Sequence, residues 1–255
     1  MRIYSWNVNG IRAATKNGFA EWLNTCGGDI IGLQEVRAFP EQIPAHVREV
    51  PGYFSHFSAA KKPGYSGVGL YTKQKPDLIE TSLGVEEFDN EGRVQIAHFP
   101  EFIIANIYFP NGQGKNNDNS RIPFKIAFYQ KLFEKLDALN QAGKKIFVMG
   151  DYNTAHRSID IARPKQNEGT SGFTAEERAE FDRVLALGWT DTFRHFSSEP
   201  NQYSWWSQRA GARTRNVGWR IDYVLASKAA MSLVKGAFIH PHILGSDHCP
   251  VGIDL

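Results

Sequence analysis

The chain has 255 residues, of which 42% are hydrophobic, and its 29 Lys and Arg against 27 Asp and Glu give a formal net charge of +2. This is enough for one large domain with a substantial core, and the lack of any run of eighteen apolar residues excludes a transmembrane helix. A charge so close to zero neither requires nor excludes a nucleic-acid partner. Only two cysteines, Cys26 and Cys249, are present, so we expect a cytoplasmic protein in which both are small core residues.

The first part of the chain predicts strands with short helices between them. Six stretches have the length and the apolar or alternating pattern of strands, namely 3–6, 30–33, 53–59, 68–72, 94–99 and 102–107. Residues 18–26 carry apolar side chains at helical spacing, and a weaker helix is expected over 40–50. Gly and Pro separate the later strands, which indicates antiparallel pairing.

The second part opens with the clearest helix, over 120–141, whose apolar side chains form one face and which Gly143 follows as a stop. Another helix is expected to begin at Thr174, because Thr174 and Glu177 form a capping box. Further strands are expected over 145–149, 221–226 and 250–255, and near Tyr203.

The expected order of elements has helices scattered among mostly antiparallel strands. It lacks the strict alternation of strand and helix that a parallel doubly wound sheet requires. We therefore predict one α/β domain over 1–255, a four-layer sandwich in which two packed, mixed, mostly antiparallel β-sheets are flanked by helices.

Polar side chains border several of the apolar runs, where a buried strand would begin or end. They are Asn7, Asn9, Glu35, Tyr108, Asn111, Asp151, Asn153, Asp222, Asp247 and His248. If the strands share one core, these ends can converge on one site. Oxygen ligands with a single imidazole suit a hard divalent cation and phosphate-ester chemistry.

Most of these residues also have a structural interpretation. Glu35 alone reads as a surface acid, and the two asparagines before Gly10 read as turn formers. Gly150 is expected to let the backbone turn sharply before Asp151. A structural role for Asp151, as a helix cap or in an Asx-turn, then explains it about as well as a catalytic role does. The pair Asp247–His248 is the strongest signal, and Asp222 could orient the His248 ring through a hydrogen bond.

Seven sequence motifs are typical of a known protein family. They lie at 5–13, 33–35, 108–111, 150–156, 172–178, 216–223 and 246–251. On these motifs the chain closely resembles the exonuclease III family of DNA-repair nucleases, which includes the major apurinic/apyrimidinic endonucleases and sits within an endonuclease/exonuclease/phosphatase superfamily. The motifs appear in family order from residue 2 to the end. Segments 172–174 and 216–223 are the most specific to the DNA-repair branch.

The resemblance implies a Mg2+ or Mn2+ site with Glu35 as its main ligand. The residues expected around the metal are Asn7, Asn9, Glu35, Asp151, Asn153, Asp247 and His248. In the implied mechanism Asp151 orients the attacking water or accepts its proton, with Asn153 holding the phosphate. His248, paired with Asp222, donates to a phosphate oxygen, and Tyr108 and Asn111 add further donors.

The implied reaction is hydrolysis of the phosphodiester 5′ to an abasic site in double-stranded DNA, giving a 3′-hydroxyl and a 5′-phosphate. A weaker 3′–5′ exonuclease or 3′-phosphodiesterase activity on 3′-blocked ends is expected beside it. We expect a monomer without membrane association, cytoplasmic and nucleoid-associated when bound to DNA.

Residues 203–222 interleave aromatic and basic side chains, as a nucleic-acid surface does. The predicted DNA-binding residues are Lys61, Lys62, Trp205, Arg209, Arg213, Arg215 and Trp219, although a solvated turn explains the two lysines nearly as well. The family places Trp205 and Trp219 in the abasic-site pocket, which Gly172 borders. Trp206 is expected in the core.

Three alternatives differ in what the site does. A phosphatase of the same superfamily would act on a small or lipid phosphate ester and would not need the aromatic–basic segment. A predominantly 3′–5′ exonuclease would work on DNA ends. A non-catalytic DNA-binding module would not need converging carboxylates.

Overall fold

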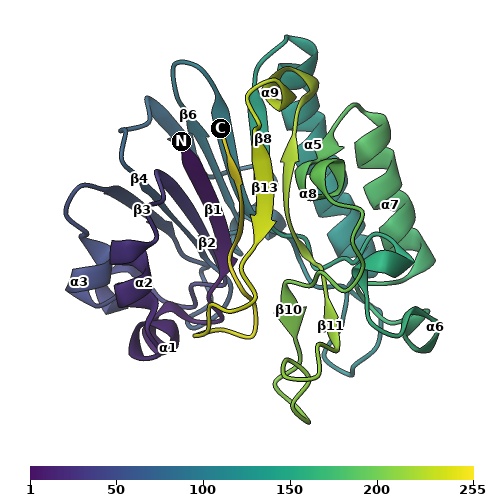
Figure 1. Cartoon of the computed structure of the whole chain (residues 1–255). Coiled ribbons are helices and arrows are strands. Elements are labelled where there is room, and N and C mark those ends of the chain that lie inside the picture. The colour runs from purple at the N-terminus through teal and green to yellow at the C-terminus, as the bar shows by residue number, and fades with distance from the viewer.

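The computed structural model describes all 255 residues, and its core is two six-stranded sheets packed face to face with helices outside them (Figure 1). The first sheet has the order β13-β14-β1-β2-β4-β3 and consists of β1 (Arg2–Asn7), β2 (Ile30–Gln34), β3 (Phe54–Ser58), β4 (Val68–Thr72), β13 (Gly236–Ile239) and β14 (Val251–Asp254). The second has the order β5-β6-β7-β8-β12-β9 and consists of β5 (Leu78–Glu80), β6 (Val94–His98), β7 (Ile103–Tyr108), β8 (Ile146–Asp151), β9 (Thr190–Asp191) and β12 (Asp222–Ala226). The predicted four-layer α/β sandwich is confirmed.

Helices cover both outer faces, and a small ribbon projects from one end of the sandwich (Figure 1). The first sheet is flanked by α1 (Ile11–Lys16), α2 (Phe19–Thr25) and α3 (Ala45–Arg48), and the second by the long helices α5 (Ile122–Gln141) and α7 (Ala175–Ala186). Shorter helices are α4 (Glu86–Asp89), α6 (Pro164–Asn167), α8 (Thr192–Phe196) and α9 (Lys228–Met231). The ribbon consists of β10 (Trp205–Trp206) and β11 (Gly218–Trp219). No helix combines the length and the apolar character that crossing a bilayer requires.

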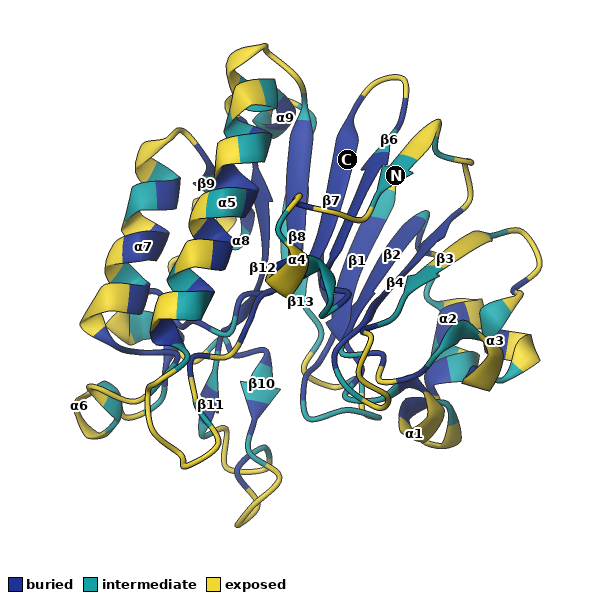
Figure 2. Cartoon of the chain, turned by 180° about the vertical axis from the view of Figure 1, so that it is seen from behind, coloured by how far each residue is buried: buried dark blue, intermediate teal, exposed yellow.

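The central strands are buried along most of their length, whereas the edge strands β3, β5 and β13 and the outer sides of the helices are partly or fully exposed (Figure 2). Between the sheets, Ile3 and Leu70 from the first meet Phe147 and Val224 from the second in one apolar cluster. Two further clusters fill the space between each sheet and its helices. This layered burial of apolar surface, at about 25 cal/mol per Å², is the main force that holds the four layers together.

Each sheet contains one parallel pair, β1–β2 and β7–β8, among antiparallel neighbours. Parallel neighbours finish at the same edge, so Asn7 lies beside Gln34 and Tyr108 lies beside Asp151. Strands β14 and β12 run antiparallel to β1 and β8 and therefore begin at that edge, which places Asp222 opposite Asp151. The predicted convergence of polar strand ends follows from this topology.

Several elements differ from the sequence-based expectation. Several short elements, whose segments are too short for a clear period, were not predicted from the sequence: α1, β5, α4, α6, β9, α8, β11, α9 and β13. The helix expected over 40–50 is a 3-10 turn over Pro40–Gln42 followed by α3, and the strand expected near Tyr203 is β10.

Two single-residue interpretations were wrong. Gly150 does not form a turn, because β8 continues to Asp151; a Cβ at Gly150 would lie 1.8 Å from the Ile107 carbonyl oxygen, so glycine is required for the close approach of β7. Cys249 is buried as expected, but Cys26 is only half-buried.

Candidate active site

Glu35 and Asp151 face each other across the side chain of Asn7, at the edge where the two sheets meet. The Asn7 amide nitrogen donates to Glu35 Oε2 at 2.9 Å and to Asp151 Oδ2 at 2.8 Å. Its oxygen accepts the backbone N–H of Asn9 at 2.9 Å. Asn7 therefore holds the two carboxylates together as a donor, and we do not carry it forward as a metal ligand.

The other two asparagines near the carboxylates also act as donors. Asn9 Nδ2 donates to Asp247 Oδ1 at 2.9 Å, and Asn153 Nδ2 donates to the Phe109 carbonyl at 3.0 Å and to Asp151 Oδ2 at 3.3 Å. Donation of this kind orients a carboxylate. These nitrogens cannot bind a metal, so the ligand role of Asn9 and Asn153 remains a prediction for their side-chain oxygens alone.

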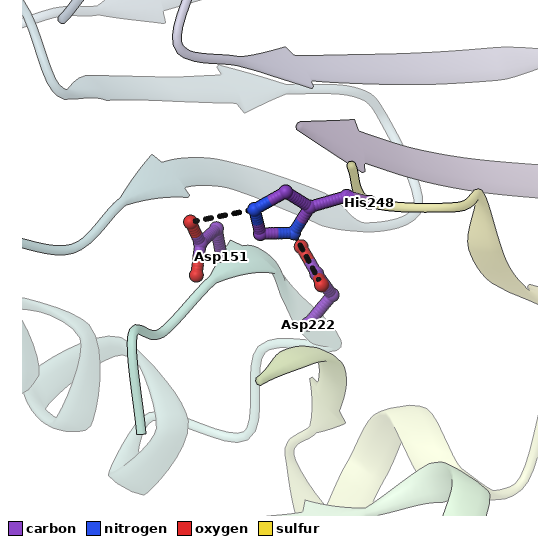
Figure 3. Close-up of side chains that lie close together, drawn as sticks. All are labelled: Asp151, Asp222 and His248. Carbon is purple, nitrogen blue, oxygen red and sulfur yellow. Dashed lines mark hydrogen bonds and ion pairs between the residues drawn. The ribbon is translucent and has the colours of Figure 1, made fainter. Parts of the chain in front are cut away.

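His248 lies between two aspartates that come from neighbouring strands (Figure 3). Its Nδ1 is 2.8 Å from Asp222 Oδ2, and its Nε2 is 3.9 Å from Asp151 Oδ2. Burial alone would lower the pKa of His248, but the charge and hydrogen bond of Asp222 outweigh it and raise that pKa to about 10. The imidazole is therefore a cation at neutral pH, with Nε2 directed at Asp151.

Burial raises the pKa of both Asp151 and Asp247, but the net shifts of the two carboxyls have opposite signs. Burial raises the pKa of Asp151 to about 7, although the His248 charge opposes this. For Asp247 burial is outweighed by His248 and by hydrogen bonds from Trp205 and Asn9, which hold its pKa below the usual value. Asp247 is thus the more strongly ionised of the two, and Asp151 is the group poised to take up a proton.

The donor set fits a hard divalent cation. Three carboxylates, those of Glu35, Asp151 and Asp247, line one cavity together with only two cationic groups, Arg37 and His248. A phosphate brought into this cavity would need further positive charge, which a divalent cation held by carboxylate oxygens would supply. Asp151, Asp222 and His248 also hold donor atoms within 4.8 Å of one another. Because His248 Nδ1 already binds Asp222, we assign the pair Asp222–His248 to proton transfer rather than to metal binding.

Three residues of the site have a left-handed backbone, with φ of 46° at Asn9, 57° at Glu35 and 49° at Asn153. This region is uncommon for residues other than glycine and concentrates at functional sites. At Glu35 it turns the chain directly after β2, which directs the carboxylate back over the strand ends. Arg37, also left-handed, forms an ion pair with Glu35.

Tyr108 is held at the site by Arg93. The buried Arg93 guanidinium lies 4.6 Å from the Tyr108 ring centre and donates to the Tyr108 carbonyl at 3.0 Å. Burial and the Glu35 charge raise the pKa of Tyr108 well above its usual value, so its hydroxyl stays a donor. Asn111, also in the predicted set, is exposed and donates to Asn153 Oδ1 at 3.2 Å.

These groups open into a cavity of about 340 Å³. Its walls include Trp205 and Trp219, whose rings meet edge to face at 5.9 Å, and Gly172. Of the predicted catalytic and pocket residues, only Asp222 is not part of the lining, because it stands behind His248. The site predicted from strand ends therefore forms one concave surface.

The predicted DNA-binding cations divide into two groups. Lys61, Lys62, Arg209 and Arg215 are exposed. Arg213 instead donates to the carbonyls of Pro241, Ile243 and Ser246 and stacks on the Trp206 ring at 4.6 Å. Its guanidinium braces the loop that precedes Asp247, so we do not carry it forward as a phosphate contact. Trp206 is buried as expected.

Some site residues were not found from the sequence. Arg37 and Gln113 line the cavity, and Ser171 donates to Asn111 Oδ1 at 3.2 Å. Ser204 is buried and contacts the segments that carry Asp222 and His248. Its position in the sequence gives no signal, whereas Arg37, two residues after Glu35, could have been recognised as its counter-ion.

Comparison with known proteins agrees with this geometry. The model of the endonuclease/exonuclease/phosphatase family matches residues 4–248. The chain belongs to this family. An exodeoxyribonuclease from Bacillus subtilis is 39% identical over 253 residues, covering 98% of both chains. A DNA-(apurinic or apyrimidinic site) endonuclease from Dictyostelium discoideum is also 39% identical, covering 99% of this chain and 70% of the relative.

Solved structures of the endonuclease/exonuclease/phosphatase family have the same fold. The catalytic domain of Xenopus laevis APE2 superposes with a TM-score of 0.87 at 30% identity, covering 100% of this chain and 91% of that one. Because relatives that match almost the whole chain are named as an exodeoxyribonuclease and an apurinic endonuclease, the chain is a nuclease of the exonuclease III type.

Proposed function

We propose that the protein hydrolyses the phosphodiester 5′ to an abasic site in duplex DNA, with Mg2+ or Mn2+, and leaves a 3′-hydroxyl and a 5′-phosphate. The observation that carries this proposal is the shared cavity, in which three carboxylates and His248 face two tryptophan rings. A phosphodiester bound at the charged side brings its sugar against the aromatic side. The relatives named as apurinic endonuclease and exodeoxyribonuclease support the same substrate.

A bound metal would neutralise charge on the scissile phosphate and on the leaving oxygen. Glu35, Asp151 and Asp247 are the residues that would hold it. Asp151 orients the attacking water and accepts its proton. His248 donates from Nε2 to a phosphate oxygen as negative charge grows, and Asp222 stabilises the imidazolium at Nδ1.

A 3′–5′ exonuclease or 3′-phosphodiesterase activity accompanies incision. The last phosphodiester at a 3′ end is the same kind of bond as the one cleaved at an abasic site, but no further strand continues on its 3′ side. The balance between the two activities depends on the cavity wall near Gly172. A monomer that is cytoplasmic, and nucleoid-associated when bound to DNA, remains our prediction.

Product analysis tests the proposal. A 5′-labelled duplex with one abasic analogue is incubated with Mg2+, with EDTA, and beside an undamaged duplex. We expect one incision product at the abasic position, formed only with Mg2+ and only from the abasic duplex, that a DNA polymerase can extend from its 3′-hydroxyl. Trimming from the 3′ ends would instead shorten the labelled strand of both duplexes. Release of phosphate from a small phosphate ester without DNA cleavage would support the phosphatase alternative instead.

A further inference from the structure

Residues 204–206, which form β10 and the serine before it, join the wall of the cavity to three charged groups of the site. The backbone N–H of Trp206 donates to the Asp247 carbonyl at 3.0 Å, and the N–H of Cys249 donates to the Ser204 carbonyl at 2.8 Å. Trp205 forms a β-bridge with His248. The ribbon that carries the wall is therefore continuous with the loop that carries Asp247 and His248.

Side chains of the same segment reach further. The indole Nε1 of Trp205 donates to Asp247 Oδ2 at 3.1 Å. The hydroxyl of Ser204 accepts the backbone N–H groups of Ile221 and Asp222 at 3.0 and 3.1 Å, which fixes the start of β12. Three consecutive residues thus contact Asp222, Asp247 and His248, which lie far from one another in the sequence.

The Asp247 carboxylate has both oxygens engaged, one by Trp205 and the other by Asn9 at 2.9 Å. Ser246 Oγ also donates to the oxygen that Asn9 binds, at 3.3 Å, so Trp205 is the one side-chain donor to Oδ2. Removal of a donor that orients a metal-site carboxylate usually costs about 10-fold to 100-fold in metal affinity or activity. The Trp205 N–H has the geometry of such a donor.

Trp219 provides an internal comparison. Its ring lines the same cavity and meets Trp205 edge to face, but its indole N–H has no acceptor within the protein. The two tryptophans therefore share the aromatic wall, and only Trp205 is bonded to a carboxylate of the site.

We propose that Trp205 is a positioning residue for Asp247, and that its indole N–H couples the sugar-binding wall to the chemical step. This inference rests on the proposed function. A sugar that packs against the Trp205 ring acts on the same group that orients Asp247, so a correctly filled pocket keeps the carboxylate in place. Trp205 then contributes to turnover beyond its part in binding.

The matched variants are Trp205→Phe and Trp219→Phe, each of which keeps an aromatic face and removes an indole N–H. We expect Trp205→Phe to lower the single-turnover rate on an abasic duplex about 10-fold or more, with DNA affinity little changed. Because the Trp219 indole N–H is not bonded to a carboxylate, Trp219→Phe should slow single turnover less than Trp205→Phe does. Thermal unfolding of both variants verifies that they are folded.

A double-mutant cycle shows whether the effect runs through Asp247. The Asp247→Ala variant lacks the acceptor of the Trp205 N–H. In this background Trp205→Phe should slow single turnover by less than about twofold, which is the usual deviation from additivity for two residues that do not interact. Calorimetric titration of Mn2+ into the DNA-free protein adds a readout that does not depend on activity. Trp205→Phe should weaken Mn2+ binding, and Trp219→Phe should leave it unchanged.

Equal losses in the two backgrounds, or wild-type Mn2+ affinity in Trp205→Phe, would overturn the proposal. Failure of the proposed function would look different. The wild-type protein would then leave abasic DNA uncut, while the Mn2+ titrations would still separate the two tryptophan variants if the inference about Trp205 is correct.

Discussion

Asp222 and Asp151 are register partners on the antiparallel strands β12 and β8, and His248 lies between their carboxylates. The backbone ladder fixes their spacing, so the imidazole is confined with Nδ1 on Asp222 and Nε2 toward Asp151. This arrangement makes His248 a buried cation aimed at the place where charge develops. It also makes the site depend on strand register rather than on a mobile loop.

Asp151→Asn and His248→Asn should each lower turnover by about a hundredfold to ten-thousandfold, since each removes proton transfer or transition-state hydrogen bonding. Single-turnover cleavage of an abasic duplex measures the loss. Asp182→Asn is the matched control, because Asp182 binds His156 at 2.6 Å outside the site and is exposed. A near-normal rate in either site variant removes that residue from the mechanism.

Glu35→Gln should raise the Mg2+ concentration needed for half-maximal turnover far more than it weakens DNA binding. The carboxylate charge is lost, while the side-chain shape and the contact with Asn7 remain. Glu49→Gln serves as control, because Glu49 pairs with Arg48 at the surface. Unchanged turnover at low Mg2+ would show that Glu35 is not the main ligand.

DNA affinity should fall steeply with salt despite the net charge of +2. The exposed cations Lys61, Lys62, Arg209 and Arg215 can each add about −0.9 to the slope of log affinity against log salt. Replacing Arg209 and Arg215 by Ala should make the slope shallower, whereas Lys228→Ala, at α9, should not. A flat response in the wild-type protein would mean that these charges face away from the duplex.

Gly172→His should depress abasic-site incision more than 3′-end trimming, because a side chain there enters the sugar pocket. A Cβ at Gly172 would lie 3.0 Å from the Trp219 ring and 3.1 Å from the Asn153 carbonyl. The residue also has φ of 91°, so substitution strains the backbone as well.

Gly169→His separates the two effects, since Gly169 has φ of 78° in the same loop but open space around its Cβ position. Backbone strain alone should act similarly at both glycines. If Gly172→His reduces incision and end trimming equally, the pocket interpretation is wrong.

The sequence predicted the fold and the convergence of the polar groups because strand ends are marked locally. Apolar runs stop at Asn7, Glu35, Tyr108 and Asp151, and the topology of two parallel pairs brings those stops to one edge. The capping box of Thr174 and Glu177 is likewise a local signal, and it is present.

What could not be predicted depends on contacts between distant residues. The sequence predicts that Arg213 contacts phosphate. In the structure its guanidinium instead donates to three carbonyl groups that lie 28 to 33 positions away in the sequence. The bond from Trp205 to Asp247 spans 42 positions. The family resemblance implies that Asn7, Asn9 and Asn153 surround the metal, and only the geometry shows that their nitrogens face the carboxylates.

The most direct test of the account is the ratio of single-turnover rates on two duplexes of one sequence, one with an internal abasic analogue and one with a recessed 3′ end, both at saturating Mg2+. The cavity between Trp205, Trp219 and Gly172 predicts faster incision at the abasic site, and no cleavage of either duplex in EDTA. Faster release of nucleotides from the recessed end, with the abasic duplex left intact, would contradict it.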